Sequence, residues 1–402
     1  MIGKELRSQF PIFLDPQLIY LDNAATTHKP QVVIDALTDF YTKRNAPVHR
    51  GIYPLAEVAT EHYETVRAQV AKFINARSAK EIVFTSGATN GCNLVAGAWG
   101  QKNISSGDEI VVSVLEHHSN LLPWQRLAQR AGARLVWLPI TTDAQLDLTN
   151  LDSVITAKTK LVALTLDSNV IGLVDRAKLK MLIKRAHEVG ARVLLDAAQA
   201  VAHQPIDVQA LGCDFLVFSG HKVYGPTGVG VLYVRQEEHA RLDPYGVGGG
   251  MVYEVQPEGS VWRAMPHLLE AGTPPIAQVI GLGAALSYLT QVTTWSELKA
   301  HEAALVNQVR VSLEVIPGVA ILGSQKEGRN SHLLSFSSKK YHSHDIAAFC
   351  ASRGICVRAG HHCCQPLHNF LGVESSIRVS FGIYNTHDDV VRLTTCLSAF
   401  LG

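Results

Sequence analysis

The feature that most constrains this chain is a series of short apolar segments that alternate with stretches typical of α-helices. The apolar segments are residues 82–84, 110–114, 134–138, 161–166, 192–195, 214–218 and 229–234. Because these segments are apolar on both faces, the alternation predicts a largely parallel, seven-stranded sheet clad by helices, an α/β fold. Ligands bind such sheets outside the carboxyl ends of the strands, and several polar clusters fall at those ends.

The pattern changes after Val234, where glycine-rich and proline-containing segments predict loops. We expect a large domain over residues 16–263 and a smaller α+β domain formed by residues 1–15 and 264–402. The smaller domain is predicted to contain helices and strands at residues 276–289, 295–316, 332–336, 345–352, 377–381 and 388–400.

Composition excludes several classes of protein. The chain has 402 residues, of which 47% are hydrophobic and 18% charged, so it can bury a large core and is not disordered. A net charge of +1 gives no electrostatic reason to expect nucleic acid or an anionic membrane as a partner. The first ten residues lack a signal-peptide core, and no apolar run approaches the roughly 20 residues that span a bilayer. We therefore expect a soluble, cytoplasmic protein.

A lysine occupies an unusual place in the segment Ser219-Gly-His-Lys222, which follows one apolar strand and precedes another. Desolvation lowers the pKa of a lysine amine, which suits Lys222 to forming a Schiff base with a carbonyl compound. The alternative is a lysine at a hairpin end that extends into water.

Asp196 favours the first interpretation, because it ends a buried strand where an unpaired carboxylate is costly. It would act either as a helix cap or salt-bridge partner, or as the partner of a protonated ring nitrogen. An aspartate for the pyridinium and a lysine for the Schiff base are what pyridoxal 5′-phosphate (PLP) requires of its protein. Together, the two residues predict a PLP site.

Two further clusters would complete such a site. Residues 85–89 open a helix after a strand, where backbone N–H groups and the Thr89 hydroxyl would hold a phosphate, with Ser219 and His221 as additional donors. Ordinary helix capping is the alternative. His117 follows another strand end and would stack on a flat cofactor and move protons, unless it belongs to a surface histidine pair.

The segment 358–366 contains two histidines followed by Cys363 and Cys364. A zinc site is disfavoured because the four candidate ligands are contiguous and no second pair completes them. A structural turn with incidental cysteines is the second interpretation. We favour the third, a thiolate nucleophile on a mobile loop, activated by nearby histidine and arginine charge. The other five cysteines are predicted to be reduced and to pack as small hydrophobic residues.

These residues belong to ordered motifs, through which nearly the whole chain resembles the PLP-dependent, fold type I, class V aminotransferase family. Within that family the chain is most similar to the SUF-type (group II) cysteine desulfurases and selenocysteine lyases. The motifs are Tyr20–Ala25, Val48–Gly51, Glu116–His118, Asp196–Gln199, Ser219–Gly230, Glu270–Pro274 and Arg358–Cys363.

The resemblance implies a homodimeric enzyme that removes sulfur from L-cysteine, leaves L-alanine, and passes a persulfide on Cys363 to an acceptor protein, for iron–sulfur clusters or a related use. Lys222, His117 and Cys363 would be catalytic. The cofactor would be held by Lys222, Asp196, Gln199, Thr89, Ala88, Ser219, His221, His117 and, from the other subunit, Thr273. The substrate would be bound by Arg378, Asn169, Ala25 and Arg358, with His49 and Arg50 lining the neighbouring subunit's site; no metal is implied.

The chain departs from the family pattern at four positions. Ser86, Ala88 and Asn90 stand where arginine, threonine and glutamate are common, so one hydroxyl toward the phosphate is expected to be missing. Cys364 stands where alanine is common, and a neighbouring thiol would be able to resolve the Cys363 persulfide. The alternatives to a cysteine desulfurase are a selenocysteine lyase or a general C–S lyase with the same cofactor. A non-catalytic sulfur-assembly scaffold or a zinc-binding module is the alternative of a different class.

Overall fold

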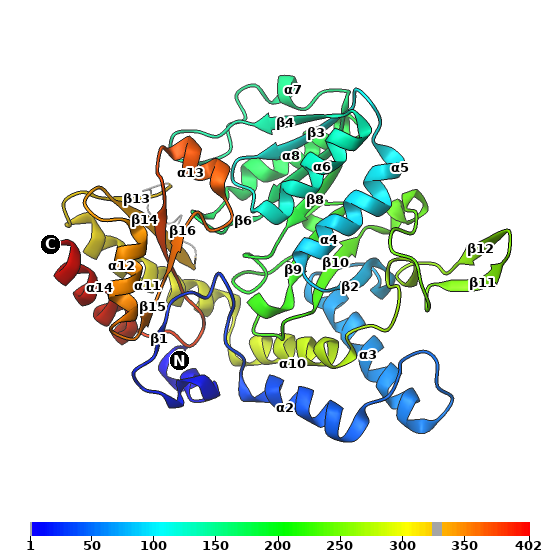
Figure 1. Cartoon of the computed structure of the whole chain (residues 1–402), viewed down its shortest axis with the longest axis horizontal. Coiled ribbons are helices and arrows are strands. Elements are labelled where there is room, and N and C mark those ends of the chain that lie inside the picture. Colours follow the sequence, from blue (N-terminus) through cyan, green and yellow to red (C-terminus); the bar gives the residue numbers. More distant parts are fainter. Residues whose placement is uncertain (1, 324–331) are drawn as a thin grey trace.

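A seven-stranded sheet forms the centre of the protein (Figure 1). The structure, a computed structural model, describes residues 2–323 and 332–402. The strand order is β2–β10–β9–β8–β5–β3–β4, and all neighbours are parallel except β10, which is antiparallel to both of its neighbours. The strands are β2 (Ile82–Thr85), β3 (Glu109–Ser113), β4 (Arg134–Leu138), β5 (Thr159–Thr165), β8 (Arg192–Asp196), β9 (Phe215–Ser219) and β10 (Gly230–Val234). The predicted sheet is confirmed.

The two faces of this sheet are covered by separate hydrophobic cores. Side chains alternate along a strand, so in β9 Phe215 and Val217 enter one core while Leu216 and Phe218 enter the other. The core on the first face also contains side chains of α4 (Ala88–Leu94) and α6 (Leu122–Ala131). The core on the second face contains those of α3 (Pro54–Phe73) and α8 (Arg176–Glu188). Burial on both faces explains why these strands are continuous apolar runs.

A smaller antiparallel sheet lies at the C-terminal side of the molecule, in the order β13–β14–β17–β16 (Figure 1). Its strands are β13 (Val319–Ile321), β14 (Leu333–Ser338), β16 (Arg358–Gly360) and β17 (Ser376–Ser380). Side chains of α11 (Trp295–Glu314), α12 (Ser343–Ala351) and α14 (His387–Leu401) share a third hydrophobic core with it. The expected smaller α+β unit is therefore present.

Helix α10 (Ile276–Val292) packs against α2 (Gln31–Asp39) and α3, and its apolar side chains join the core of the large sheet. Its sequence is apolar all round, as expected of a helix with neighbours on most sides. The predicted domain boundary at residue 264 stays a prediction. Although α10 follows this boundary in the sequence, it packs against the large sheet's side of the molecule.

A two-stranded hairpin, β11 (Val252–Gln256) and β12 (Gly259–Trp262), extends away from the body of the protein (Figure 1). The glycine-rich segment 246–250 and the proline-containing segment 257–260 predict loops here, but the structure forms a hairpin over part of this region. It exposes Tyr253, Val255, Val261 and Trp262.

No single helix in the described ranges is long and apolar enough to cross a membrane, and only α10 and α11 together, with an 84° bend between them, meet that test by length and composition.

Candidate active site

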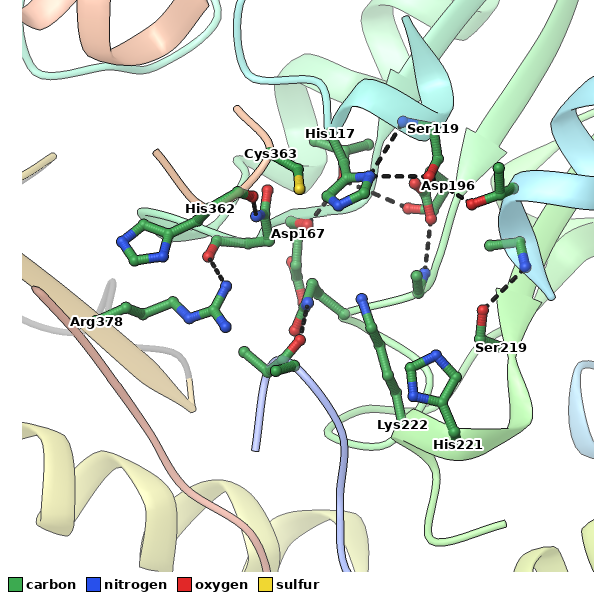
Figure 2. A pocket seen from close by; sticks show the side chains of 18 of the residues that line it. His117, Ser119, Asp167, Asp196, Ser219, His221, Lys222, His362, Cys363 and Arg378 are labelled. Carbon is green, nitrogen blue, oxygen red and sulfur yellow. Dashed lines mark hydrogen bonds between the residues drawn. The ribbon is translucent and has the colours of Figure 1, made fainter. Parts of the chain in front are cut away.

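A cavity of about 270 Å³ opens at the carboxyl ends of β5 and β8 and beside the end of β9. This is the edge at which parallel sheets bind ligands. The structure brings most of the predicted site residues together here: Ala25, Ala88, Thr89, His117, Asn169, Asp196, Gln199, Ser219, His221, Lys222, Arg358, Cys363 and Arg378. They come from segments far apart in the sequence, and Figure 2 shows His117, Lys222 and Cys363 around one cavity.

Lys222 ends a single helical turn, Gly220–Lys222, directly after β9. Burial lowers the pKa of its amine to about 8, against the opposing effect of the Asp196 carboxylate. The preceding carbonyl, that of His221, accepts hydrogen bonds from the Thr27 N–H (3.0 Å), the Thr26 and Thr27 hydroxyls (3.1 Å each) and the Lys29 amine (2.9 Å). The backbone beside Lys222 is therefore fixed, and the amine loses its proton at a lower pH than an ordinary lysine does.

Asp196 is the last residue of β8 and is buried. One of its oxygens accepts the Ala198 N–H at 2.8 Å, and burial raises the pKa of the carboxyl group. A buried acid with so few donors from the protein suits a cationic partner such as a protonated ring nitrogen. Gln199, three residues on, lines the same cavity and donates its Nε2–H to the carbonyl oxygen of Ala24 at 2.8 Å.

Hydroxyl groups gather where α4 begins. The Thr89 and Ser119 hydroxyl oxygens are 2.6 Å apart, and the Ala88 N–H donates to the Ser219 hydroxyl at 2.9 Å. His221 lines the cavity nearby, and burial lowers its pKa to about 4, so its ring is neutral. As expected, Ala88 offers no hydroxyl. The hydroxyls of Thr89, Ser119 and Ser219 are donors of the kind that hold a phosphate at the start of a helix.

His117 begins the short turn after β3, and its Nδ1 accepts the Ser119 N–H at 3.1 Å. Because Nδ1 accepts, the ring proton is assigned to Nε2. Burial, and secondarily the Lys222 charge, lower its pKa to about 3. His117 is therefore a neutral ring with one fixed tautomer.

Cys363 is exposed on the segment between β16 and α13 (Gln365–Leu371). Both His362 and Cys363 adopt positive φ, 53° and 56°, which is unusual for residues with a Cβ atom. Hydrogen bonds hold this conformation: the Cys363 carbonyl accepts the His118 N–H at 2.7 Å, and the His362 carbonyl accepts the Asn169 amide. The sequence analysis expected a mobile loop, but the loop is tied to two segments that lie far away in sequence.

Cys364 points away from the cavity. Its side chain is fully buried in the large-sheet core, its thiol contacts the Val114 carbonyl at 3.6 Å, and burial raises its pKa. The His362 ring is turned to the Ser376 hydroxyl, at 3.0 Å. These side chains diverge, and the described residues contain no group of three metal-binding side chains.

Arg378, at the centre of β17, is buried and faces the cavity. It donates to the Asn169 carbonyl (3.0 Å) and to Asp22 (3.1 Å), while its Nε has no partner in the part of the chain that the structure describes. Arg358 donates to the other oxygen of Asp22 at 3.0 Å. Two guanidinium groups thus share one carboxylate, which leaves a positive charge that suits a carboxylate ligand.

His49, Arg50 and Thr273 are not brought to this cavity. They line a smaller one of about 70 Å³, together with Arg263 and Glu270. The sequence analysis assigned these three residues to the site of a neighbouring subunit, and that assignment stays a prediction.

Several lining residues were missed by the sequence analysis: Ala24, Ser119, Thr165, Asp167, Ala198 and His362. A signal existed for two of them, because Ser119 and Asp167 stand in the polar clusters that follow β3 and β5. Asp167 is held by Arg176 at 2.7 Å and by the Gln204 amide at 2.6 Å. Its partners could not be read from local sequence.

The segment that carries Thr273 depends on a buried ion pair. Arg67, 1% exposed, donates to both oxygens of Glu270 at 2.7 and 2.9 Å. We expect Arg67→Met to lower the free energy of unfolding by about 3–5 kcal/mol, because Glu270 would be left without its counter-ion. Urea denaturation measures this change. The exposed Arg77, paired with Glu237, is the matched control, and Arg77→Met should cost less than about 1 kcal/mol; equal losses would contradict the argument.

Comparisons with known proteins show to which family this chain belongs. The family model described as aminotransferase class-V matches residues 19–393. The chain belongs to the class-V aminotransferase family. A member from Shigella flexneri, named cysteine desulfurase, is 44% identical over 398 residues, which are 98% of this chain and 97% of that protein.

Solved structures of family members agree. The apo structure of cysteine desulfurase from Thermococcus onnurineus NA1 superposes with a TM-score of 0.94 at 36% identity, covering 100% of this chain and 98% of that one. The cysteine desulfurase CsdA from Escherichia coli gives a TM-score of 0.90 at 40% identity, covering 98% and 97%. The predicted family and fold class are confirmed, and the SUF-type subgroup stays a prediction.

Proposed function

We propose that this class-V aminotransferase family member is a PLP-dependent cysteine desulfurase, which transfers the sulfur of L-cysteine to Cys363 and releases L-alanine. The observation that carries the proposal is that a buried amine, a buried carboxylate and an exposed thiol, those of Lys222, Asp196 and Cys363, line one cavity. Relatives that match 98% of the chain carry the name cysteine desulfurase.

The residues present fit PLP. Lys222 would anchor its aldehyde carbon, Asp196 would pair with the ring nitrogen, and the His117 ring would stack on it. Thr89, Ser219 and His221 would hold the phosphate, and Gln199 would approach the ring hydroxyl. When bound, PLP delocalises the negative charge that develops on the substrate's α-carbon.

The chain's own residues perform the other steps. Arg378, with Asn169 and Arg358, holds the substrate carboxylate, and Ala25 closes the wall beside it. The Lys222 amine, when it is not attached to the cofactor, takes the α-proton. The Cys363 thiolate then attacks the substrate sulfur: an S–S bond forms while the carbon–sulfur bond breaks, and its electron pair stays with the substrate carbon. His117 moves a proton at Nε2, the β-carbon that lost sulfur is protonated, and the proton held by Lys222 returns to the α-carbon, which completes L-alanine.

The proposal includes a homodimer, a sulfur-acceptor protein and a cytoplasmic setting. His49, Arg50 and Thr273 lie outside the main cavity of their own chain, as expected of residues that serve a neighbour's site. The exposed apolar side chains of the β11–β12 hairpin offer a surface that a second copy would cover. All seven cysteines are free, which fits a reducing compartment. Iron–sulfur cluster assembly, or related sulfur mobilisation, is the proposed use of the sulfur.

The deciding experiment is to incubate the purified protein and PLP with L-cysteine and dithiothreitol, and to measure alanine and sulfide. Equal amounts of both products support the proposal. Release of pyruvate and ammonia instead of alanine would identify a general C–S lyase. Parallel reactions with L-selenocysteine identify a selenocysteine lyase if only the selenium substrate turns over.

The low pKa of Lys222 predicts how cofactor capture depends on pH. Below pH 8 the amine is mostly protonated and not nucleophilic, so the rate at which apo-protein captures PLP should rise about tenfold from pH 6 to pH 7. The rate should level off above pH 8, because the pKa is about 8 rather than 10.5. Stopped-flow absorbance measures it, and a rate that keeps rising to pH 10 contradicts the lowered pKa.

A further inference from the structure

Three buried side chains that the proposed reaction does not use lie behind Gln199. They are His332, which directly precedes β14, Glu302 on α11, and His203, from the turn after β8. Their exposed fractions are small, 1% for His332 and 3% for Glu302, and the His203 side chain is 9% exposed. They come from both the large-sheet and the small-sheet parts of the chain and form a series of contacts, from Glu302 to His203 to His332, that ends at the Gln199 amide.

The contact to Gln199 defines a hydrogen-bond direction. Gln199 Nε2 donates to the Ala24 carbonyl oxygen, so its Oε1 must be the atom that accepts from His332 Nε2 at 3.1 Å. His332 therefore carries its proton on Nε2. Its Nδ1 has no partner among the described residues, which is tolerable for a lone pair but costly for a buried N–H. Burial lowers the pKa of His332 well below its ordinary value, which agrees with a neutral ring.

The orientation of the His332 ring is itself fixed. The His203 ring stacks on it with centroids 3.5 Å apart and an interplanar angle of 4°. His203 is held in turn by Glu302, whose Oε1 lies 2.6 Å from its Nδ1. Tilting the His332 ring would break the stack, and a half-turn in its own plane would put a C–H in place of Nε2, so the stack and the hydrogen bond together keep Nε2 directed at Gln199.

We propose that His332, backed by His203 and Glu302, is a positioning residue that fixes the orientation of the Gln199 amide for the cofactor. The amide nitrogen has two N–H groups; one is used by Ala24, and the second is left for the cavity that Gln199 lines. The inference rests on the proposed function, because the group that receives this N–H is the PLP ring hydroxyl. Without the His332 donor, Oε1 loses its partner and the amide loses its orientation.

Two substitutions of similar length test the role of the donor. His332→Gln keeps an N–H at the right reach, and His332→Met removes it. We expect the methionine variant to weaken PLP binding to apo-protein by about fivefold, the value of one hydrogen bond, and the glutamine variant to stay within about twofold of wild type. The readouts are the dissociation constant of PLP and the absorption band of the cofactor on Lys222.

A double-mutant cycle shows whether His332 acts through Gln199. In a Gln199→Ala background, His332→Met should change PLP affinity less than about twofold. A fivefold loss of PLP affinity that persists in that background would overturn the role of His332 but not the proposed function. The same holds if the His332→Met variant binds PLP like wild type. Wild-type protein without a Lys222-dependent band overturns the proposed function itself. Circular dichroism and thermal denaturation show whether the variants fold. If the His332→Met variant does not fold, the His332→Gln variant still tests the role of the donor, and a loss of PLP affinity of fivefold or more in that variant would overturn it.

Discussion

Lys222→Ala is expected to abolish both the yellow chromophore of the PLP-loaded protein and the release of alanine from L-cysteine. In the proposed reaction the Lys222 amine anchors the cofactor and takes the α-proton, and proton transfer by a positioned side chain alone contributes about 10²- to 10⁴-fold to a rate. Burial beside Asp196 is what sets this lysine apart from the surface lysines.

The measurement is the absorption spectrum of dialysed protein together with the alanine yield. Lys102→Ala is the matched control, because Lys102 is exposed and pairs with Asp243 at the surface. The control should keep the chromophore and the activity. A Lys222→Ala protein that retains a covalently bound chromophore would place the Schiff base on another lysine and refute the assignment.

Cys363→Ser is expected to keep the chromophore but to lose persulfide formation from L-cysteine, with a fall in rate on the order of 10⁶-fold, the size of the loss when a protease loses its serine nucleophile. A serine hydroxyl is not ionised near neutral pH, so it does not attack sulfur. Selenocysteine turnover should fall less, because selenide leaves more readily. Persulfide is measured by mass spectrometry after alkylation.

The neighbouring cysteine provides the control. Because the Cys364 thiol is buried toward the Val114 carbonyl, Cys364→Ala should leave persulfide formation on Cys363 unchanged. This corrects the expectation that the second thiol is placed to resolve the persulfide. If Cys364→Ala abolishes the persulfide while Cys363→Ser does not, the nucleophile has been assigned to the wrong residue.

Local sequence was sufficient to predict the strands of the large sheet, because a strand buried on both faces is an apolar run whichever strands it pairs with. Local sequence also predicted Lys222, Asp196 and His117 as site residues, since each lies at the end of one of those strands or within four residues after it. The parallel topology then brings strand ends together, so polar residues at separate strand ends predict one site. The same reasoning would have found Ser119 and Asp167.

Other features depend on contacts between distant parts of the chain, which local patterns do not reveal. Gln199 meets His332 across 133 positions, and the Cys363 loop is held by His118 and Asn169. A segment with two histidines and two cysteines appears flexible when its own residues alone are considered. The packing of α10 on α2 and α3 was missed for the same reason, since an apolar helix does not specify its neighbours.

The attachment of the Cys363 segment limits how sulfur can leave the enzyme. Cys364 and Leu367 are embedded in the core of the large sheet on one side of the thiol, and the His118 N–H holds the Cys363 carbonyl. A cysteine held in this way cannot move far from the cavity while it carries a persulfide. In the proposed reaction the acceptor would therefore have to bring its own thiol to Cys363 at the cavity, so the reach and flexibility of the acceptor's thiol-bearing segment should govern the transfer of sulfur.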